Sequence, residues 1–351
     1  MANMNGNLSD RMKVLYLINY APNYREPLLR ELGKRVNLTV ASYRGDAAGL
    51  VDPEERVGYR FVELKRHRVA GVNFNIREFL MGFNYDLIIV GYTLWHPMRM
   101  ANLFRFKPVV AEGLIYGRSN SWITRCLRRM FLTVADNILV YSKLVERRLR
   151  NEIKNKEIIP FNNTSYALSE LKQLPITLRD NRLNILWIGS MKKRKKVHLL
   201  VELARRNKSV NIRLIGPGMT YESFTDVPEN LDLLGPLFGD CLEEHFLWSH
   251  VVFNPGNIGL LVMNAARYSR CLVIDNKSQH GPEVQLAYDA DQIFIDFEDS
   301  NMVDSMVSRL LKNSVLLRSK GIDAFNEMKN YTLEFMVEKY IEAIRLSWRN
   351  R

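Results

Sequence analysis

Short apolar runs alternate with helical patterns through the first half of the chain. Segment 24–35 carries leucines on one face and a glycine near its end, which predicts a helix. The runs between such patterns are continuously apolar, as expected for parallel strands buried on both faces. We therefore expect a doubly wound α/β domain. Its predicted strands are 12–19, 36–43, 85–92, 106–114, 137–143 and 156–164.

The same alternation begins again after a polar segment that contains Pro175. Segment 168–182 is interpreted as a linker between a first domain, 11–167, and a second, 183–328, followed by a helical segment, 329–351. Two such α/β domains would face a cleft, with ligands held outside the carboxyl ends of the strands. The strands predicted in the second domain are 183–190, 210–218, 251–257, 270–276 and 292–299.

Composition narrows the class of protein. The 351 residues are 47% hydrophobic and include three scattered cysteines, Cys126, Cys241 and Cys271, without a C-x-x-C pair. We expect free, buried thiols rather than disulfides or a structural zinc site. No apolar run approaches the roughly 18 to 20 residues that a membrane span needs. These features predict a cytoplasmic protein.

Charge distinguishes the two halves. Residues 1–175 hold 27 Lys and Arg against 16 Asp and Glu, whereas the remainder holds 23 against 22. Nearly all of the net charge of +12 therefore lies in the first half. Such asymmetry favours an anionic partner for that half. Alternatively, the positive charge is spread evenly over the surface and has no partner. The chain has no RNP-like motif or zinc knuckle, so we expect no nucleic-acid partner.

Several motifs, taken in order, carry a resemblance to a known family. The chain resembles the retaining GT-B glycosyltransferases of family 4, in the subgroup with a Pro-Gly-Asn-Val-Gly-Leu donor motif. The resemblance implies two Rossmann-like domains, a C-terminal helix that crosses back to the first domain, and sugar transfer from a nucleotide donor without a metal. It also implies a glycan or lipid-diphosphate acceptor in surface polysaccharide synthesis (lipopolysaccharide or capsule). The motifs are INYAPNYREPLLREL, ILVYSK, IIPFNNT, ILWIGSMKKRKKVHLLVELA, IRLIGPG, VVFNPGNIGLLVMNAARYSRCLVIDN with the following QHGPE, and YTLEFMVEKYIEAI.

The second domain carries the residues that would bind the donor. Lys195 lies six residues beyond Gly189, where the family has a lysine that stabilises the departing diphosphate; the basic run around it is alternatively a solvated turn. The glycines of Pro-Gly-Asn-Ile-Gly would let backbone and a helix N-terminus approach the ligand, or would simply form a tight turn. The donor-side candidates are Gly189, Ser190, Arg194, Lys195, Gly216, Gly218, Phe238, Gly256, Asn257, Gly259, Leu260, Asn264 and Glu283.

Some positions depart from the family pattern. Ser190 stands where an arginine is usual, with Arg194 as its possible substitute, and Gly256 and Asn264 occupy the positions of a paired-glutamate motif. In the first domain, VVAEGLIYGRS replaces a histidine-containing segment. As a catalytic residue, its Glu112 would orient the acceptor hydroxyl or serve as a weak base. Alternatively, Glu112 would pair with Arg118 as a structural carboxylate. The acceptor-side candidates are Tyr24, Arg25, His96, Tyr116 and Arg118.

His96 would face the cleft, or it would be a structural residue with satisfied contacts. No histidine spacing and no D-x-D motif points to a metal, so no cofactor or divalent cation is expected.

Segment 119–137 places arginines beside aromatic residues at helical spacing. This pattern suits either a peripheral contact with an anionic membrane or a helix packed on the core. Two other functions stay open: a nucleotide-sugar epimerase of the same architecture, and a non-catalytic binder of anionic membrane or nucleic acid.

Overall fold

The computed structural model describes residues 12–45, 51–116, 121–178 and 181–349. The chain divides into two compact units: Met1–Ser165 together with Leu333–Arg351, and Tyr166–Thr332. Segment 168–178, expected to belong to a linker, packs on the second unit: Ile176 is buried in its core, and Arg270 donates hydrogen bonds to the carbonyl oxygens of Leu174 and Pro175.

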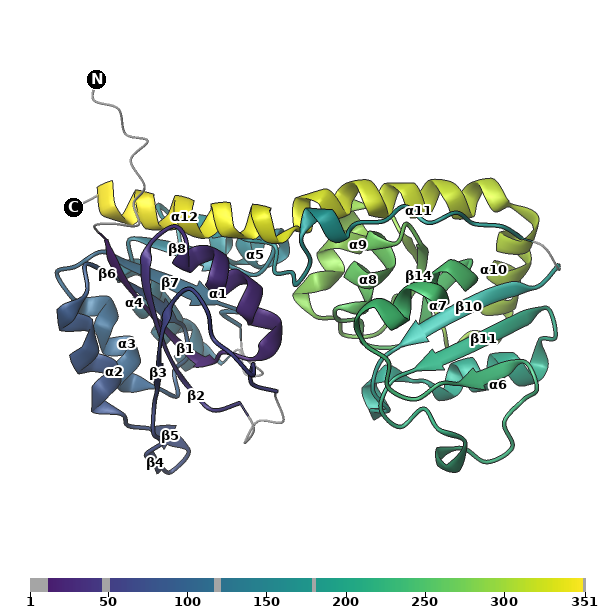
Figure 1. The fold of residues 1–351 in the computed structure, drawn as a ribbon, viewed down its shortest axis with the longest axis horizontal. Coiled ribbons are helices and arrows are strands. Elements are labelled where there is room, and N and C mark those ends of the chain that lie inside the picture. Colours follow the sequence, from purple (N-terminus) through teal and green to yellow (C-terminus); the bar gives the residue numbers. More distant parts are fainter. Residues whose placement is uncertain (1–11, 46–50, 117–120, 179–180, 350–351) are drawn as a thin grey trace, which may run out of the picture. The chain divides into compact units, whose positions relative to one another are not determined.

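The first unit contains a seven-stranded parallel sheet with the order β3-β2-β1-β6-β7-β8-β9 (Figure 1). The order reverses at β1, which lies between β2 and β6. Such a reversal opens a crevice at the carboxyl ends of the two central strands. The strands are β1 (Lys13–Tyr20), β2 (Asn37–Tyr43), β3 (Arg60–Glu63), β6 (Leu87–Gly91), β7 (Val109–Gly113), β8 (Asn137–Val140) and β9 (Glu157–Pro160).

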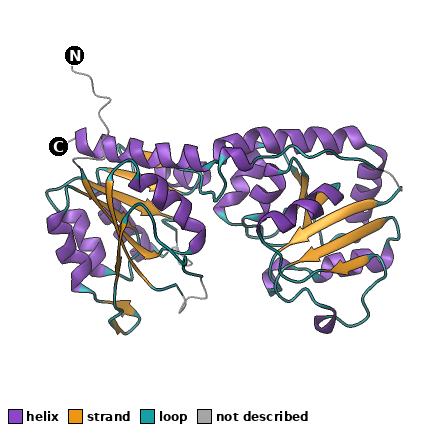
Figure 2. Cartoon of the chain, viewed as in Figure 1, coloured by secondary structure: helices purple, strands orange, loops and turns teal. Residues whose placement is uncertain are grey.

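Helices cover both faces of this sheet (Figure 2). Successive residues of β1 point to opposite faces, so Val14 and Tyr16 join one hydrophobic cluster while Leu15 and Leu17 join another. The first cluster includes the buried faces of α1 (Glu26–Gly33) and α12 (Leu333–Arg349). The C-terminal helix thus belongs to the first unit. The second cluster includes residues of α3 (Pro97–Met100), α4 (Trp122–Val134) and α5 (Lys143–Glu152).

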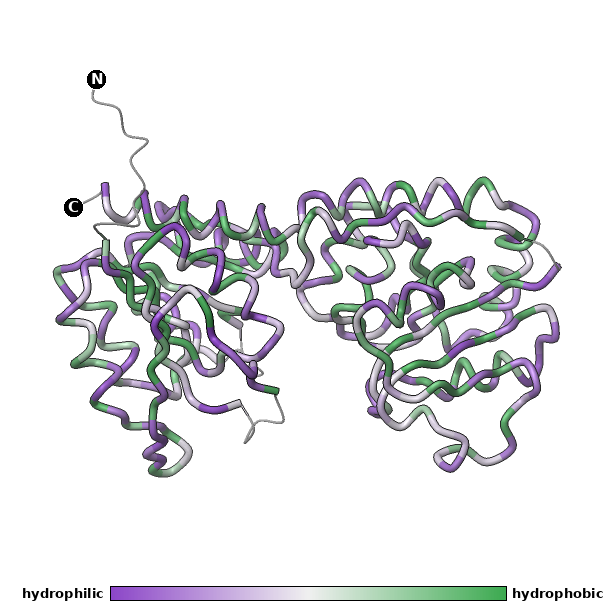
Figure 3. Tube along the Cα trace, in the orientation of Figure 1, coloured by the Kyte–Doolittle hydropathy of each residue, from purple (hydrophilic) through white to green (hydrophobic). Residues whose placement is uncertain are grey.

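The second unit contains a six-stranded parallel sheet with the order β12-β11-β10-β13-β14-β15. Hydrophobic residues concentrate in the strands of both sheets (Figure 3). The strands are β10 (Leu183–Ile188), β11 (Val210–Ile215), β12 (Leu231–Leu233), β13 (Val251–Asn254), β14 (Cys271–Asp275) and β15 (Ile293–Ile295). The helices are α6 (His198–Arg206), α7 (Glu243–Trp248), α8 (Leu261–Arg267), α9 (Gln285–Asp289), α10 (Ser300–Lys312) and α11 (Ser314–Met328).

Two parallel α/β units confirm the expected fold class. The sequence pattern missed the edge strands β3 and β12, which are only four and three residues long. It also missed the small antiparallel hairpin β4 (Arg68–Val69) and β5 (Val72–Asn73), together with the short helix α2 (Ile76–Leu80). Such short elements carry too few residues for a hydrophobic period to appear.

All three cysteines are free, as expected, but burial was predicted wrongly for two of them. Cys271 is buried in β14, whereas Cys126 lies on an exposed part of α4 and Cys241 lies in an exposed turn before α7. Within the described ranges, none of the helices is both long enough and apolar enough to span a bilayer.

Candidate functional site

In the second unit, two loops meet where the strand order reverses between β10 and β13. The loop after β10 carries the basic run, and the loop after β13 carries the Pro-Gly-Asn-Ile-Gly motif. The Asn257 backbone N–H donates to the Arg194 carbonyl oxygen at 2.9 Å. Segments more than 60 residues apart in sequence are thereby joined at the carboxyl edge of the sheet, which is where a doubly wound fold binds its ligands.

Gly256 makes this approach possible. A Cβ atom at this position would lie 2.5 Å from the Arg194 carbonyl oxygen and 2.6 Å from the Lys195 carbonyl carbon. Those are backbone atoms, so no side-chain rotation would relieve the clash. Around Gly259, by contrast, a Cβ would meet nothing within 4 Å. The structure therefore assigns close loop packing to Gly256 and leaves space open beside Gly259.

A second pair of turns borders the same edge. The Gly189 N–H donates to the Ile215 carbonyl oxygen at 2.9 Å, and a Cβ on Gly216 would lie 1.8 Å from the Gly189 carbonyl oxygen. Gly216 and Gly218 both have positive φ, of 138° and 85°. Glycine is needed here because other residues rarely adopt that backbone region.

The basic run separates into lysines with different environments. Lys195 is partly buried, and its Nζ donates to the Asn257 carbonyl oxygen at 2.6 Å. Burial, together with the positive charges of Arg194 and Lys192, lowers the pKa of Lys195. Lys196 instead pairs with Asp275 at 3.2 Å and Glu298 at 2.8 Å. Lys196 is thus held by two carboxylates, whereas Lys195 contacts a backbone carbonyl oxygen.

Glu283 lies within electrostatic range of Lys195. Burial raises the pKa of Glu283, and the positive charge of Lys195 opposes that rise. Sequence reasoning missed the neighbouring His280. Its Nδ1 accepts from the Ile258 N–H at 3.2 Å while Nε2 donates to the Asp275 carbonyl oxygen at 2.7 Å, which ties the Gly-rich loop to the end of β14. The signal available was its position in the loop that follows β14.

The remaining donor-side candidates are not linked to Lys195 by a hydrogen bond or ion pair among the described residues. Asn264, on α8, accepts a hydrogen bond from the Tyr166 hydroxyl at 2.7 Å, so its side-chain oxygen already has a partner. Phe238 is largely exposed in the turn before α7. Leu260 caps α8 and is exposed, and Ser190 accepts the Lys192 N–H at 2.8 Å through its carbonyl oxygen.

The first unit has a cavity of about 690 Å³ at the carboxyl ends of β1, β6 and β7. Its wall combines aromatic rings with charged groups, the composition typical of a site for a polar organic ligand. Three expected acceptor-side residues line it, and His96 lies outside its lining. The aromatic members of the wall are Tyr20, Tyr24, Tyr92, Trp95, Tyr116 and Tyr141, and the charged members are Arg25, Arg99, Glu112 and Arg128.

Glu112 belongs to a buried polar network. Its Oε1 accepts from Arg25 Nη2 at 3.4 Å and from the Tyr340 hydroxyl at 3.3 Å, so a helix from the chain's end contacts the cavity wall. Arg25 also donates to the Tyr16 hydroxyl at 2.8 Å and to the Tyr141 hydroxyl. Within the described ranges, Glu112 Oε2 has no hydrogen-bond partner. The pairing partner is Arg25; Arg118, the partner considered from sequence, lies outside the described residues.

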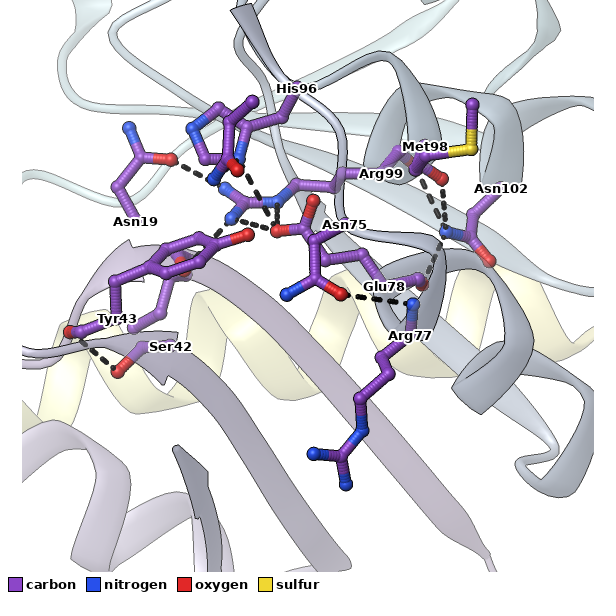
Figure 4. A network of polar contacts seen from close by, with 12 residues as sticks. Asn19, Ser42, Tyr43, Asn75, Arg77, Glu78, His96, Met98, Arg99 and Asn102 are labelled. Carbon is purple, nitrogen blue, oxygen red and sulfur yellow. Dashed lines mark hydrogen bonds and ion pairs between the residues drawn. The ribbon is translucent and has the colours of Figure 1, made fainter. Parts of the chain in front are cut away.

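A second buried network is centred on Arg99, which also lines the cavity (Figure 4). Arg99 donates through Nε to Glu78 Oε1 at 2.9 Å and through Nη1 to Asn19 Oδ1 at 2.6 Å, and both charged side chains are fully buried. His96 Nδ1 lies 3.4 Å from the same Glu78 oxygen. Burial lowers the pKa of His96 despite that carboxylate. The structure thus gives His96 contacts of the structural kind.

Tyr116 lies between two guanidinium groups. The Cζ atoms of Arg128 and Arg148 lie 4.5 and 3.9 Å from its ring centroid, and its hydroxyl donates to Glu152 Oε1 at 3.1 Å. Burial and the Glu152 charge raise the pKa of Tyr116 to about 12. Arg128 forms a two-point contact with Glu152 at 2.8 and 3.1 Å. Arg128 is therefore buried, rather than lying at the exposed flank of α4.

Comparisons with known proteins decide the fold. No family model and no curated protein sequence matches the chain. Solved structures do: a glycosyltransferase from Rickettsia africae (TM-score 0.71, 12% identity, covering 97% of this chain and 100% of that one) and HepE from Anabaena in complex with UDP-glucose (0.67, 11%, 95% and 100%). The lipopolysaccharide outer core galactosyltransferase WaaB is similar too (0.66, 12%, 95% and 99%). The fold is that of the GT-B glycosyltransferases.

The comparisons do not reach the family 4 subgroup or its donor motif, which remain expectations from sequence. In the part of the chain that the structure describes, no group of three or more His, Cys, Asp or Glu side chains is arranged to hold a metal ion.

Proposed function

We propose that the protein is a retaining, metal-independent glycosyltransferase that moves a sugar from a nucleotide donor to a glycan or lipid-linked acceptor in surface polysaccharide synthesis. The observation that carries the proposal is Lys195, partly buried between two Gly-containing loops in the crevice of the second sheet. The fold supports it, because structures with this fold include a protein in complex with UDP-glucose.

The chemistry assigned to the second unit is leaving-group stabilisation. The bond between the sugar and the diphosphate breaks with charge developing on the phosphate oxygen, and a fixed ammonium group stabilises that charge. Burial strengthens the interaction because the effective dielectric constant is lower than in water. Lys195 supplies the charge, while Gly256 and Gly216 let the loops that hold it pack closely.

The chemistry assigned to the first unit is acceptor binding. The aromatic wall of its cavity suits the faces of sugar rings, and Glu112 Oε2 is a hydrogen-bond acceptor for a hydroxyl group. In a retaining front-face reaction the donor phosphate takes the proton of the attacking hydroxyl. Glu112 then orients the acceptor without serving as the base.

A ligand panel tests the donor proposal. Thermal unfolding would be followed with UDP-, GDP-, ADP-, CMP- and dTDP-sugars, because a ligand that binds the native state raises Tm. We expect one nucleotide class to raise Tm, and Lys195→Met to abolish the shift. Lys193→Met is the matched control, since Lys193 is an exposed lysine of the same turn. No shift with any nucleotide, or equal loss in both variants, contradicts the donor site.

Turnover tests the rest of the proposal. Transfer activity that persists in EDTA supports metal independence, and NMR of the product's anomeric proton reports retention or inversion. Inversion, or activity that requires a divalent cation, would contradict those parts while leaving the donor site in place.

The proposal includes docking of α4 on an anionic membrane. Trp122, Ile123 and Met130 fall on one side of this helix and are 68%, 52% and 46% exposed, while Phe131 and Leu132 pack on the core. The exposed Arg125 and Arg129 flank that side, so charge complementarity favours an anionic lipid surface. Phe104, which contacts α4 through Phe131, adds a further exposed ring.

Sedimentation with vesicles tests this docking. We expect binding to phosphatidylglycerol-containing vesicles, weaker binding to phosphatidylcholine alone, and loss in a Trp122→Ser, Ile123→Ser variant. Val315→Ser, at an exposed apolar residue of the second unit, is the control. Undiminished sedimentation of the double variant would refute docking through α4.

A further inference from the structure

A second cavity, of about 370 Å³, adjoins the acceptor cavity of the first unit. The two share lining residues at the ends of β1 and β6: Asn19, Tyr20, Thr93 and Trp95. Trp95 is 63% exposed although it lines both cavities, so its ring is available to a ligand. A molecule seated in the first cavity would therefore reach the second by passing Trp95.

The second cavity has a positive lining. Arg66 and Arg68 line it, and no described carboxylate does. The nearby acidic groups have other partners: Glu63 pairs with Arg44, and Glu78 pairs with Arg99. His96 also lines the cavity, but burial lowers its pKa, so the positive charge comes from the arginines.

Arg66 is held in place before any ligand arrives. Its Nη2 donates to the Tyr20 hydroxyl at 2.8 Å and to the Arg44 carbonyl oxygen at 3.3 Å, and its guanidinium lies 5.2 Å from the centroid of the Tyr20 ring. Both bonds use Nη2, which leaves the Nη1 and Nε donors without partners among the described residues. A fixed guanidinium with free donors is suited to phosphate or carboxylate.

Arg68 is carried by the hairpin of β4 and β5. The hairpin is tied to the tryptophan loop, because the Asn73 N–H donates to the Trp95 carbonyl oxygen at 2.8 Å. The Arg68 side chain is exposed, and its guanidinium has no hydrogen-bond or ion-pair partner in the described part of the chain. The hairpin thus places an uncompensated positive charge at the wall that also contains Trp95.

We propose that the second cavity is an anion subsite for the acceptor: a sugar ring stacks on Trp95, and a phosphate or carboxylate on that acceptor contacts Arg66 and Arg68. The inference rests on the proposed function and deepens it, since it names the acceptor class as an anionic glycan. Phosphate and carboxylate share this recognition chemistry, so the experiment separates them.

Ligand-observed NMR titrations test the subsite with three probes: methyl glucoside (neutral), methyl glucuronide (a carboxylate) and glucose 1-phosphate (a phosphate). We expect at least one charged probe to bind about fivefold tighter than the neutral one, with a preference that weakens as salt rises. The probe that gains affinity identifies the anion. Equal affinities for all three probes would overturn the proposal.

Variants locate the effect. Arg68→Gln should remove the preference for the charged probe, whereas Arg147→Gln, at an exposed arginine of α5, should leave it intact. Trp95→Ala should weaken all three probes. An unchanged preference in Arg68→Gln would overturn the subsite. Displacement of the charged probe by UDP would also overturn it, because the probe would then occupy the donor site.

The outcome is separable from that of the transferase proposal. Donor binding is read by the UDP-sugar thermal shift, which Arg68→Gln should not change because Arg68 belongs to the first unit. Failure of the donor shift with a normal probe preference rejects the transferase alone. Donor binding without any probe preference rejects the subsite alone.

Discussion

The crevices of the two sheets have the same topology but differ in whether their buried positive charges are paired with carboxylates. In the first unit, the buried guanidinium groups of Arg25, Arg99 and Arg128 each contact a carboxylate within 3.4 Å. In the second unit, Lys195 contacts a backbone carbonyl oxygen and lies near Glu283 without an ion pair within the described ranges. Among the described residues, the buried arginines of the first cavity are therefore paired, and Arg66 and Arg68, which have no ion pair there, line only the adjoining cavity. In the second crevice, Lys195 itself has no ion pair among the described residues.

Under the proposed function, this difference would fit the two units to different ligands. A buried, compensated arginine fixes the shape of a cavity, but it contributes little net charge to a ligand. A lysine whose pKa is lowered by burial gains from an incoming phosphate, because the anion restores the favourable charged state.

Arg99→Met should destabilise the first unit most. It leaves the fully buried Glu78 carboxylate without its charged partner, and such a loss costs about 3–5 kcal/mol. Burial raises the pKa of Glu78, but the hydrogen bond from His96 and the positive charge of Arg99 together lower it. Removing the Arg99 charge leaves the effect of burial less opposed. The free energy of unfolding of the variant should therefore fall further as rising pH ionises Glu78.

Urea unfolding measures this effect. Arg35→Met is the control, since the Arg35–Glu338 pair is about half exposed on both sides and is worth about 0–1 kcal/mol. Equal losses in the two variants would show that the Arg99 pair does not stabilise the cavity.

Gly256→Ala should disrupt the second crevice while the first stays intact. The added methyl group meets backbone atoms of Arg194 and Lys195, so the two loops must separate. We expect the affinity for the stabilising nucleotide-sugar to fall at least about tenfold, a loss of roughly 1.4 kcal/mol. Gly259→Ala, with open space around its Cβ, should change affinity little. Calorimetric titration measures the affinity of both variants. Equal affinities of Gly256→Ala and Gly259→Ala would contradict the role given to Gly256.

Tyr340→Phe should weaken the attachment of α12 to the first sheet. The hydroxyl contacts both Glu112 Oε1 and the Tyr16 hydroxyl, at 3.3 and 3.2 Å, and its loss should cost about 1 kcal/mol. Amide hydrogen exchange of α12 would report the change. Tyr288→Phe, at an exposed tyrosine of the second unit, should have no such effect. Unaltered exchange in Tyr340→Phe would argue that packing alone holds the helix.

The affinity for the stabilising nucleotide-sugar should fall as pH rises, by about threefold or less per titrating group. Two groups act with the same sign. Rising pH removes the proton of Lys195, whose pKa is lowered, and ionises Glu283, whose pKa is raised. Either change makes the crevice more negative, and the donor's diphosphate, esterified on both sides, keeps a constant charge.

Glu283→Gln should flatten the acidic part of that profile and leave the alkaline part. Titration calorimetry at several pH values measures it. His280 bonds through both ring nitrogens and its pKa is lowered by burial, so it should not contribute near neutral pH. An affinity that increases with pH would contradict the assigned roles of both groups.

Most of the fold could be predicted because its signals are local. Continuous apolar runs marked the central strands, and the leucine pattern of segment 24–35 marked α1 to within two residues. Strands β3 and β12 and the β4–β5 hairpin gave no such signal, because each strand has only two to four residues. The hairpin that carries Arg68 was therefore missed.

The location of the candidate donor site could be predicted from sequence about as well as the fold. Glycines and lysines in loops after apolar strands must lie at the carboxyl edge of a parallel sheet, so order along the chain places them together. The distinct environments of Lys195 and Lys196 were not accessible, since they depend on Asp275 and Glu298, about 80 and 100 residues further along.

The sequence by itself determined the two α/β units, the Gly-rich and basic loops, and the charge asymmetry of the halves. Tertiary structure alone decided which charges are compensated. Arg25 binds Glu112, which lies 87 positions away, and Glu112 also accepts a hydrogen bond from Tyr340, 228 positions further along. Arg128 turns inward to Glu152 although its helix pattern suggested an exposed flank. Hydrophobic periodicity is a property of neighbouring residues, whereas charge compensation depends on contacts that exist only after the chain has folded.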